Sequence, residues 1–307
     1  MNHLFVYTFY RFKNLGNLNE TKNTLSNFFK NSKIKGTILI SNEGINGSLA
    51  GSRKELDASI KLIKTYFKIK KLDLKINNTK FIPFNKIKIR IKKEIVSLGQ
   101  GIIDVNKYSG KLVDPKDWDR IILDKDTKLI DVRNEFEIGI GKFKNSINPK
   151  TNSFREFPDS ISKLEINKKD KIAMYCTGGI RCEKASAFLK ISGYRNVYQL
   201  KGGIINYLKY KKNSAKDSLW NGECFVFDGR VTINKKLNKG RYFQCYGCRR
   251  PITKKDLNSP EYKKGVSCPH CVNERTAEQK FSSLTRQRQI ERAEKKKEDH
   301  TFKMISL

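Results

Sequence analysis

The sequence predicts an α/β protein built from three parts. The N-terminal third alternates strand and helix patterns, the middle third places helices between short apolar strands, and the last third holds two Cys-x2-Cys pairs. Strands that alternate with helices are typical of a parallel sheet. The predicted organisation is a first domain at 1–98, a linker at 99–116, a second domain at 117–213, a Cys-rich segment at 214–275 and a basic helical tail at 276–307.

Composition limits the class of protein. The 307 residues include 64 Lys and Arg against 31 Asp and Glu, a formal net charge of +33, and 37% are hydrophobic. This content supports folded cores and excludes a wholly disordered chain. The positive charge fits a nucleic-acid partner, but a compositional bias toward Lys would give the same excess. Composition alone leaves both explanations open.

No part of the sequence predicts a membrane or secretory segment. No apolar run approaches the roughly 20 residues that span a bilayer. The first residues also lack the basic, apolar and small-residue regions of a secretory signal. We therefore expect a cytoplasmic protein without membrane contact.

The N-terminal third predicts a split β-α-β-β-α-β arrangement of the ferredoxin-like kind. Ser52 lies three residues before Glu55, which is a capping-box pattern for a helix start. A turn-rich stretch at 42–47 separates the second and third strands. The predicted elements are a strand at His3–Phe12, a helix at Leu18–Phe29, strands at Gly36–Ile40 and Ser48–Ala50, a helix at Arg53–Phe67, and strands at Leu72–Ile76 and Ile87–Ile91.

The last of these strands carries alternating cations. The period of two places all of them on one face and the intervening isoleucines on the other. This face is either an ordinary solvated sheet surface or a strip that faces phosphates of a nucleic acid. The cations are Lys86, Lys88, Arg90 and Lys92.

The middle third contains a loop that favours a reactive thiol. Strands are predicted at Lys128–Val132, Lys171–Tyr175 and Asn196–Leu200, with a helix at Cys182–Ile191. Cys176 follows the second of them, at the end of the sheet where α/β proteins bind ligands. The loop that we expect to surround its sulfur as an anion cradle is Thr177, Gly178, Gly179 and Ile180.

Three features of this loop favour the Cys176 thiolate. The glycines allow backbone N–H groups to turn inward, the next helix presents its positive end, and Arg181 adds a cation. The alternative is a buried cysteine that only packs. Cys182 is either a thiol that resolves an oxidised Cys176 or a Ser-like residue that opens the helix.

Four cysteines near the C-terminus have the spacing of a metal site. Cys245 and Cys248 form one pair, and Cys268 and Cys271 form the other. This is the four-thiolate zinc pattern, and we expect a structural zinc ion because all four positions are filled. Disulfides are the alternative, which a cytosolic chain disfavours. His270 lies between two ligands and is not expected to bind.

A polar helix is predicted beyond the cysteines, over Glu274–Asp299. It contains many Lys and Arg and few apolar residues. It is either a solvated tail or a basic arm that contacts the phosphates of a polyanionic partner.

Several motifs resemble a known family. The Cys-x4-Arg loop and Asp131-Val132-Arg133 resemble the rhodanese domain, in which we expect Arg133 to brace the sheet edge. Longer stretches resemble the rhodanese-containing tRNA uridine(34) hydroxylases, and together they cover the chain up to about Lys280. These stretches are Ser41–Gly47, Lys93–Val96, Phe154–Pro158, Met174–Lys184 and Gly222–Asp228.

The resemblance implies a fold and an activity. The fold is an N-terminal ferredoxin-like (acylphosphatase-like) domain, a central rhodanese domain and a Cys-rich C-terminal segment. The activity is oxygen-dependent hydroxylation of the wobble uridine of tRNA to 5-hydroxyuridine, with Cys176 as catalytic residue, tRNA as partner and molecular oxygen as co-substrate. The sequence identifies neither an electron donor nor a stable protein partner.

Two other functions fit the same residues. One is a rhodanese-type sulfurtransferase that carries sulfur as a Cys176 persulfide. The other is a non-catalytic tRNA-binding protein, in which Cys176 has no chemical role.

Overall fold

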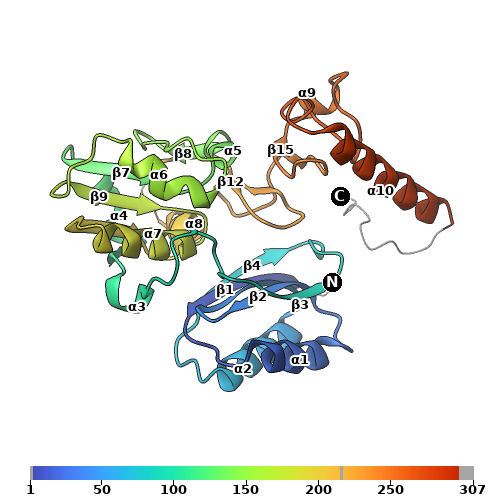
Figure 1. Ribbon diagram of the computed structural model, residues 1–307, viewed down its shortest axis with the longest axis horizontal. Helices are drawn as coiled ribbons and strands as arrows, with labels where there is room; N and C mark the ends of the chain where they lie inside the picture. The colour runs from blue at the N-terminus through green and yellow to red at the C-terminus, as the bar shows by residue number, and fades with distance from the viewer. Residues whose placement is uncertain (1–2, 215–216, 297–307) are drawn as a thin grey trace.

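The computed structural model describes residues 3–214 and 217–296, which form three lobes along the chain (Figure 1). In these ranges no helix combines the length and apolar character needed to cross a membrane. The last part of the predicted tail, 297–307, lies outside the described residues.

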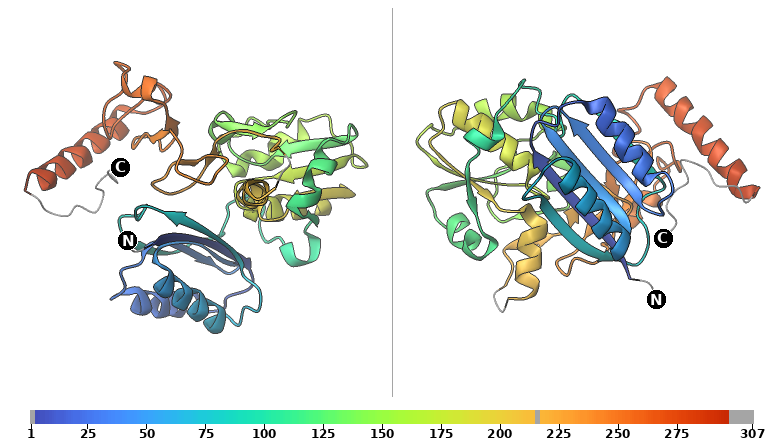
Figure 2. Two further views of the ribbon diagram at one scale, coloured as in Figure 1. Left: turned by 180° about the vertical axis from the view of Figure 1, so that it is seen from behind. Right: turned by 90° about the horizontal axis from the view of Figure 1, so that it is seen from below.

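The N-terminal lobe is a five-stranded sheet with two helices on one face (Figure 2). Its strand order is β4-β1-β3-β2-β5, so the first four strands have the predicted ferredoxin-like arrangement and β5 is an addition parallel to β2. The elements are β1 (Leu4–Phe12), α1 (Leu18–Phe29), β2 (Lys35–Ser41), β3 (Gly44–Ser52), α2 (Arg53–Tyr66), β4 (Asp73–Thr79) and β5 (Ile87–Ile91).

Local sequence explains most of these boundaries. The Ser52 side chain accepts a hydrogen bond from the Glu55 N–H, so the predicted cap begins α2. The predicted turn at 42–47 is wrong in length, because β3 already begins at Gly44. A Cβ on Gly44 would lie 2.1 Å from the Arg11 carbonyl oxygen. Glycine is therefore required here because β3 and β1 pair closely, and not because the chain turns.

The central lobe is a parallel four-stranded sheet with apolar clusters on both faces. The strand order is β6-β10-β9-β7. Its strands are β6 (Lys111–Val113), β7 (Thr127–Asp131), β9 (Lys171–Tyr175) and β10 (Asn196–Leu200), and its helices are α4 (Pro115–Ile122), α5 (Glu135–Ile138), α6 (Phe157–Ser162), α7 (Ile180–Ile191) and α8 (Gly203–Lys212), with a 3-10 turn η1 (Phe154–Glu156).

Two predicted boundaries around this lobe are wrong. The stretch 99–116 is no linker, because it contains α3 (Val105–Tyr108) and the edge strand β6, and Val105 is buried in the core. The Cys-rich segment does not begin at 214, because β11 (Trp220–Gly222) pairs with β8 (Gly141–Phe143). Strands of three residues are too short to show a period of two, so sequence patterns do not reveal them.

The C-terminal lobe is small and is completed by one long helix. Its elements are β12 (Cys224–Phe225) and β13 (Thr232–Ile233) at the junction with the central lobe, then β14 (Phe243–Gln244), β15 (Pro251–Ile252), α9 (Lys254–Leu257) and α10 (Ala277–Lys295). The predicted helix is thus confirmed over 277–295.

Two arginines attach α10 to the turns around the cysteines. The Arg275 guanidinium donates to the Gly247 carbonyl and to Ser283 Oγ, the latter at 2.7 Å. Arg286 Nη2 donates to the Tyr246 carbonyl at 3.3 Å. Two cations of the predicted basic arm, Arg275 and Arg286, therefore stabilise the packing of this lobe.

Candidate active site and candidate metal site

Cys176 lies directly after β9, in a closed loop before α7. Its side chain is buried, with 1% of the residue exposed. The Gly179 N–H donates to Cys176 Sγ at 3.1 Å, and Gly179 has a φ of 101°, a left-handed conformation that glycine adopts without strain. The inward N–H expected from the Gly-Gly sequence is present.

The surroundings of Cys176 favour its thiolate. Burial acts to raise the pKa, but the Cys182 thiol, the Arg181 charge and the N–H groups of Cys182 and Gly179 outweigh it and lower the pKa to about 6. Burial and the neighbouring Cys176 raise the pKa of Cys182 well above its usual value. Cys182 therefore stays protonated and donates to Cys176, which carries the negative charge at neutral pH.

Arg181 is positioned by a carboxylate that the sequence analysis missed. Its two terminal nitrogens bind the oxygens of Glu137 at 2.6 and 2.8 Å, and both side chains are buried. The Arg181 charge helps to hold the Glu137 pKa below its usual value, against burial that raises it. Glu137 also closes the capping box of Asn134 at the start of α5, which is the one local signal that marks it.

The N-terminal lobe contributes two side chains to the rim of this loop. The Tyr10 hydroxyl donates to Glu183 Oε1 at 2.7 Å and lies 2.9 Å from the place where a Cβ on Gly179 would be. Lys75 Nζ lies 5.1 Å from the Tyr10 ring centroid, and Lys75 is paired with Asp73. These contacts join segments far apart in sequence, and no sequence pattern predicts them.

Three of the family-like motifs meet in one buried ion cluster. Lys184 Nζ, from the Met174–Lys184 stretch, is fully buried and donates to Glu43 at 2.6 Å and to Glu94. It also donates to the Val96 carbonyl at 3.1 Å. Glu43 and Glu94 come from the Ser41–Gly47 and Lys93–Val96 motifs. These motifs therefore fix the N-terminal lobe against α7.

Two further motifs, Asp131–Arg133 and Gly222–Asp228, brace the loop from the other side. The Phe225 carbonyl accepts from Thr177 Oγ1 at 3.4 Å, and the Arg181 guanidinium lies 5.6 Å from the Phe227 ring centroid. Arg133 is fully buried, pairs with Asp131 at 2.6 Å and donates to the carbonyls of Glu137 and Gly141. The bracing role expected of Arg133 is confirmed.

The four C-terminal cysteines converge as their spacing predicts. Their sulfur atoms all lie within 4.8 Å of one another. Three Sγ–Sγ distances are 3.7, 3.9 and 4.0 Å, close to the separation of about 3.8 Å in a tetrahedral site with Zn–S bonds of about 2.3 Å. His270 Nε2 lies 3.5 Å from Asp256 rather than in this group. The cluster could therefore bind one metal ion.

The predicted cationic strip lies on a different edge from the Cys176 loop. Ile87 and Ile89 pack against the core under α1 and α2, so the period of two places Lys88 and Arg90 on the opposite face. Within residues 3–214 and 217–296, no carboxylate forms an ion pair with Lys86, Lys88, Arg90 or Lys92.

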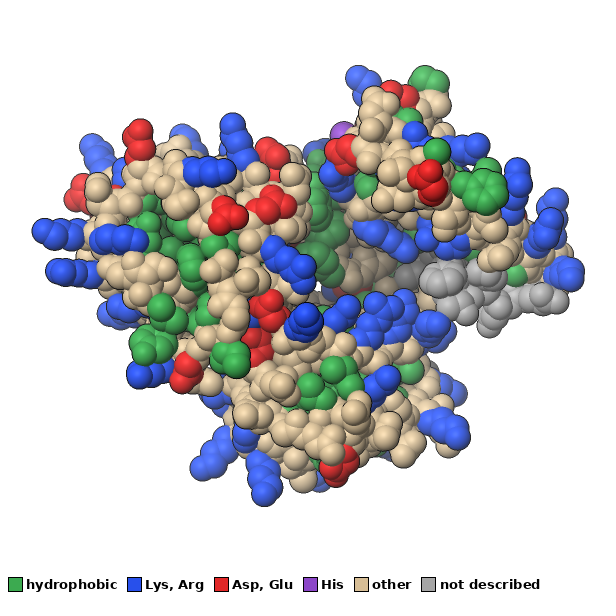
Figure 3. Space-filling model, in the orientation of Figure 1, with side chains coloured by type: hydrophobic (Ala, Val, Ile, Leu, Met, Phe, Trp, Pro, Cys, Tyr) green, Lys and Arg blue, Asp and Glu red, His purple; other side chains and the backbone are tan. Residues whose placement is uncertain are grey.

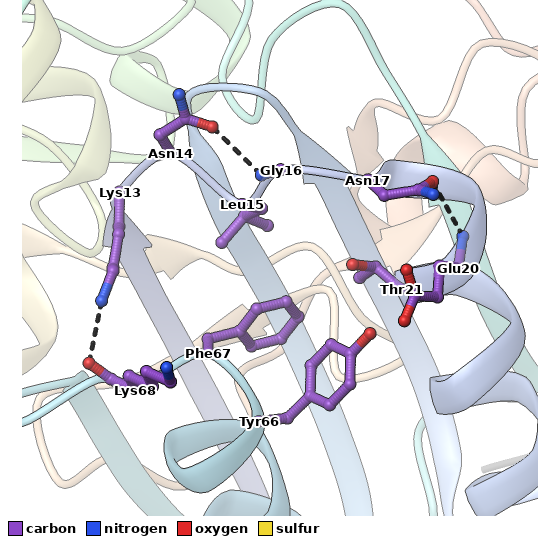
Figure 4. A pocket seen from close by; sticks show the side chains of 10 residues that line it. All are labelled: Lys13, Asn14, Leu15, Gly16, Asn17, Glu20, Thr21, Tyr66, Phe67 and Lys68. Carbon is purple, nitrogen blue, oxygen red and sulfur yellow. Dashed lines mark hydrogen bonds between the residues drawn. The ribbon is translucent and has the colours of Figure 1, made fainter.

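A separate hollow lies on the N-terminal lobe (Figure 4). Its polar groups serve local structure: Lys13 Nζ donates to the Lys68 carbonyl at 2.8 Å, and Asn17 caps α1 through the Glu20 N–H. None of the predicted site residues lines it. The lining residues are Lys13, Asn14, Leu15, Gly16, Asn17, Glu20, Thr21, Tyr66, Phe67 and Lys68.

Comparison with known proteins decides the family. The chain is 47% identical over 298 residues to the tRNA uridine(34) hydroxylase of Pelagibacter ubique (strain HTCC1062), with 97% of each chain covered. This chain belongs to the tRNA uridine(34) hydroxylase family. Residues 4–95 match the UPF0176 acylphosphatase like domain, and residues 114–209 match the rhodanese-like domain. Both expected domains of the tRNA uridine(34) hydroxylase family are thus present.

Two of the similar solved structures each cover about a third of the chain. A rhodanese-related protein from Thermoplasma volcanium is 28% identical, covering 33% of this chain and 92% of its own, with a TM-score of 0.28. A rhodanese-like domain protein from Staphylococcus aureus is 22% identical, covering 32% of this chain and 90% of its own, with a TM-score of 0.28.

Proposed function

We propose that this protein hydroxylates the uridine at the wobble position of tRNA to 5-hydroxyuridine, with Cys176 as the catalytic residue. The relative from Pelagibacter ubique bears the name of this activity and matches nearly the whole chain. The assignment to Cys176 rests on its buried loop, in which the Gly179 N–H donates to Sγ at 3.1 Å, and on the pKa of about 6 that these surroundings give the thiol. Arg181 and Cys182 support the thiolate in this proposal.

The reaction needs a co-substrate and a reductant. One atom of molecular oxygen enters the C5–H bond of uracil. The other atom leaves as water, which requires two electrons and two protons from an external donor. The closed loop around Cys176 would keep bulk water away from the reacting base.

The proposal also includes a structural zinc ion, tRNA as the partner and a cytoplasmic location. Zn²⁺ fits the four thiolates of the C-terminal cluster and would leave no open coordination position, so its role is structural. The net charge of +33 suits a tRNA partner, and we infer a cytoplasmic location, where this tRNA would be modified.

The test is mass spectrometry of tRNA nucleosides after incubation with oxygen and a reductant. We expect wild-type protein to form 5-hydroxyuridine in tRNA from a deletion strain, and Cys176→Ala to form none. Cys224→Ala is the second cysteine variant: Cys224 packs in the apolar cluster on the other face of the sheet from Cys176, but its side chain contacts Thr177 of the loop, so we expect a reduced rate rather than a complete loss. Product formation by Cys176→Ala would refute the assigned role.

A second candidate is sulfur transfer through a Cys176 persulfide. The Gly179 N–H that faces Cys176 Sγ would stabilise a terminal persulfide sulfur equally well. This function predicts transfer of sulfur from thiosulfate to cyanide and a mass increase of one sulfur atom on Cys176. Failure of both, with 5-hydroxyuridine formed, would exclude it.

A further inference from the structure

Strand pairing aligns five polar side chains across the N-terminal sheet. They lie on the face opposite α1 and α2, because directly paired residues in a sheet point to the same side. Thr8 pairs with both Lys75 and Ser48, Ser48 pairs with Thr37, and Thr37 pairs with Lys88. We name this set, Lys75–Thr8–Ser48–Thr37–Lys88, the cross-strand row.

One end of the cross-strand row lies at the Cys176 loop. Lys75 Cε is 4.0 Å from the place that a Cβ on Gly178 would occupy. The rest of the row is partly exposed, in the order Thr8, Ser48, Thr37 and Lys88. The Thr8 and Ser48 hydroxyl oxygens are 2.9 Å apart. Four strand spacings of about 4.8 Å place Lys88 about 19 Å from Lys75.

The other end lies beside the C-terminal lobe. The Gly229 N–H donates to the Pro83 carbonyl at 2.9 Å, and Lys239 Nζ lies 6.0 Å from the Phe81 ring centroid. These contacts connect the lobe to the β4–β5 connection. Arg249, in the turn after Cys248, is stacked 5.0 Å from the Tyr246 ring centroid and reaches the neighbourhood of Lys88.

Cations from the two lobes gather here without acidic partners. Burial and then Arg90, Lys86 and Arg249 lower the pKa of Lys88. Among the described residues, neither Lys88, Arg90 nor Arg249 has a carboxylate at ion-pair distance. Figure 3 shows Lys and Arg side chains on both sides of the hollow between these lobes.

This arrangement fits one class of ligand. Like charges held together are unfavourable until an anion binds between them. Ser and Thr hydroxyls are regular partners of phosphate and sugar oxygens in nucleic-acid complexes. An ordinary solvated sheet face would explain exposed lysines, but it would not explain a continuous polar row that connects a reactive thiol to a second cationic lobe.

We propose that the cross-strand row, together with Arg249, binds the RNA backbone that leads to the base presented to Cys176. The hydroxyl side chains contact the nucleotides next to that base, and Lys75, which is buried and paired with Asp73, forms the end of the row at the Cys176 loop. Lys88 and Arg249 bind phosphates at the far end. The inference rests on the proposed function for naming tRNA as the polyanion.

The test measures RNA binding separately from chemistry. All variants carry Cys176→Ala, and binding of a fluorescent anticodon stem-loop is followed by anisotropy at several salt concentrations. Lys88→Glu with Arg249→Glu should raise Kd by at least about tenfold and flatten the slope of log K against log salt by about 0.7–0.9 for each lost phosphate contact. Lys125→Glu with Lys169→Glu makes the same charge change before β7 and β9, at the opposite end of the central sheet, and should have a smaller effect.

A neutral variant tests the hydroxyl row itself. Thr37→Val keeps the shape of the side chain and a strand-compatible residue but removes the hydroxyl. In the protein with Cys176 intact, we expect a raised KM for tRNA with kcat unchanged. If Thr37→Val has the wild-type KM and the double charge reversal binds RNA as the Lys125/Lys169 control does, the proposal is overturned.

The two proposals fail in different ways. If Cys176→Ala still forms 5-hydroxyuridine, the assigned role of Cys176 is wrong, while a loss of RNA binding in the charge-reversed variant still supports the RNA surface. If binding is unchanged while Cys176→Ala is inactive, the proposed function stands and the surface is refuted.

Discussion

At the scale of single residues, Cys176 depends on three different kinds of neighbour. The Cys182 thiol donates a hydrogen bond to Cys176, the Arg181 guanidinium supplies a positive charge, and the backbone supplies N–H groups. Together they outweigh the burial that would otherwise keep the thiol protonated. Arg181 is in turn held by Glu137 of α5, which lies 44 residues earlier in the chain, so the charge state of Cys176 depends on a distant helix.

The pH dependence of the reaction follows from this pKa. The thiolate fraction of Cys176 should fall as the pH drops through about 6, and the single-turnover rate of 5-hydroxyuridine formation should fall with it. Arg181→Met removes a cation, so we expect its inflection at a higher pH. Arg195→Met, on an exposed loop before β10, should keep the wild-type profile. A flat wild-type profile between pH 5 and about 8 would contradict a thiolate mechanism.

The lowered pKa of Cys176 also makes the free energy of unfolding depend on pH. A thiol whose folded pKa is lowered contributes stability above its unfolded pKa, and this contribution is lost as the pH falls through the folded value. For Cys176 the loss therefore begins as the pH falls below the usual value of 9.0 and is complete once the pH is below about 6.

At the scale of elements, α7 is the common support of the site. Its first turn carries Arg181 and Cys182, and its next two residues, Glu183 and Lys184, contact the N-terminal lobe. The helix that begins at the anion cradle thus also orients the lobe that carries the cross-strand row. A shift of this helix would move both together.

We expect Lys184→Met to destabilise the protein strongly. The substitution leaves Glu43 and Glu94 near each other without their cation, and breaking a buried pair typically costs about 3–5 kcal/mol. Urea unfolding measures the change. Lys190→Met, at the exposed C-terminal end of the same helix, should cost less than about 0.5 kcal/mol. Equal stability of the two variants would show that the cluster does not join the lobes.

At the scale of the whole molecule, the three lobes differ in how they are stabilised. The N-terminal and central lobes have large apolar clusters. The buried cluster of the C-terminal lobe consists of Cys245, Ile252, Cys268 and Cys271. A core this small needs a metal ion or another cross-link to hold a fold.

Metal removal should therefore unfold one lobe selectively. With a zinc chelator, we expect hydrogen exchange to increase in α10 and in the turns around the cysteines, while β1–β4 and β7–β10 keep their protection. Cys248→Ser should have the same effect without chelator. Unchanged protection of α10 in both cases would argue against a structural metal site.

Sequence patterns predicted elements best where one period runs uninterrupted. The alternation at Ile87–Ile91 matches β5 residue for residue. The pattern failed at Gly44, where strand pairing rather than a turn requires glycine, and at β6, which is three residues long and is stabilised by its neighbour β10. In both cases the deciding contact comes from a distant segment.

The chemistry was readable in the sequence because it is local. Cys176, the two glycines and Arg181 lie within six consecutive residues, and the four C-terminal cysteines form two Cys-x2-Cys pairs. The tertiary structure alone decided that Glu137 holds Arg181, that Tyr10 and Lys75 reach the loop, and that Lys75 and Lys88 end the same row. These relations depend on strand register and on packing between lobes, which long-range contacts set and local propensity does not encode.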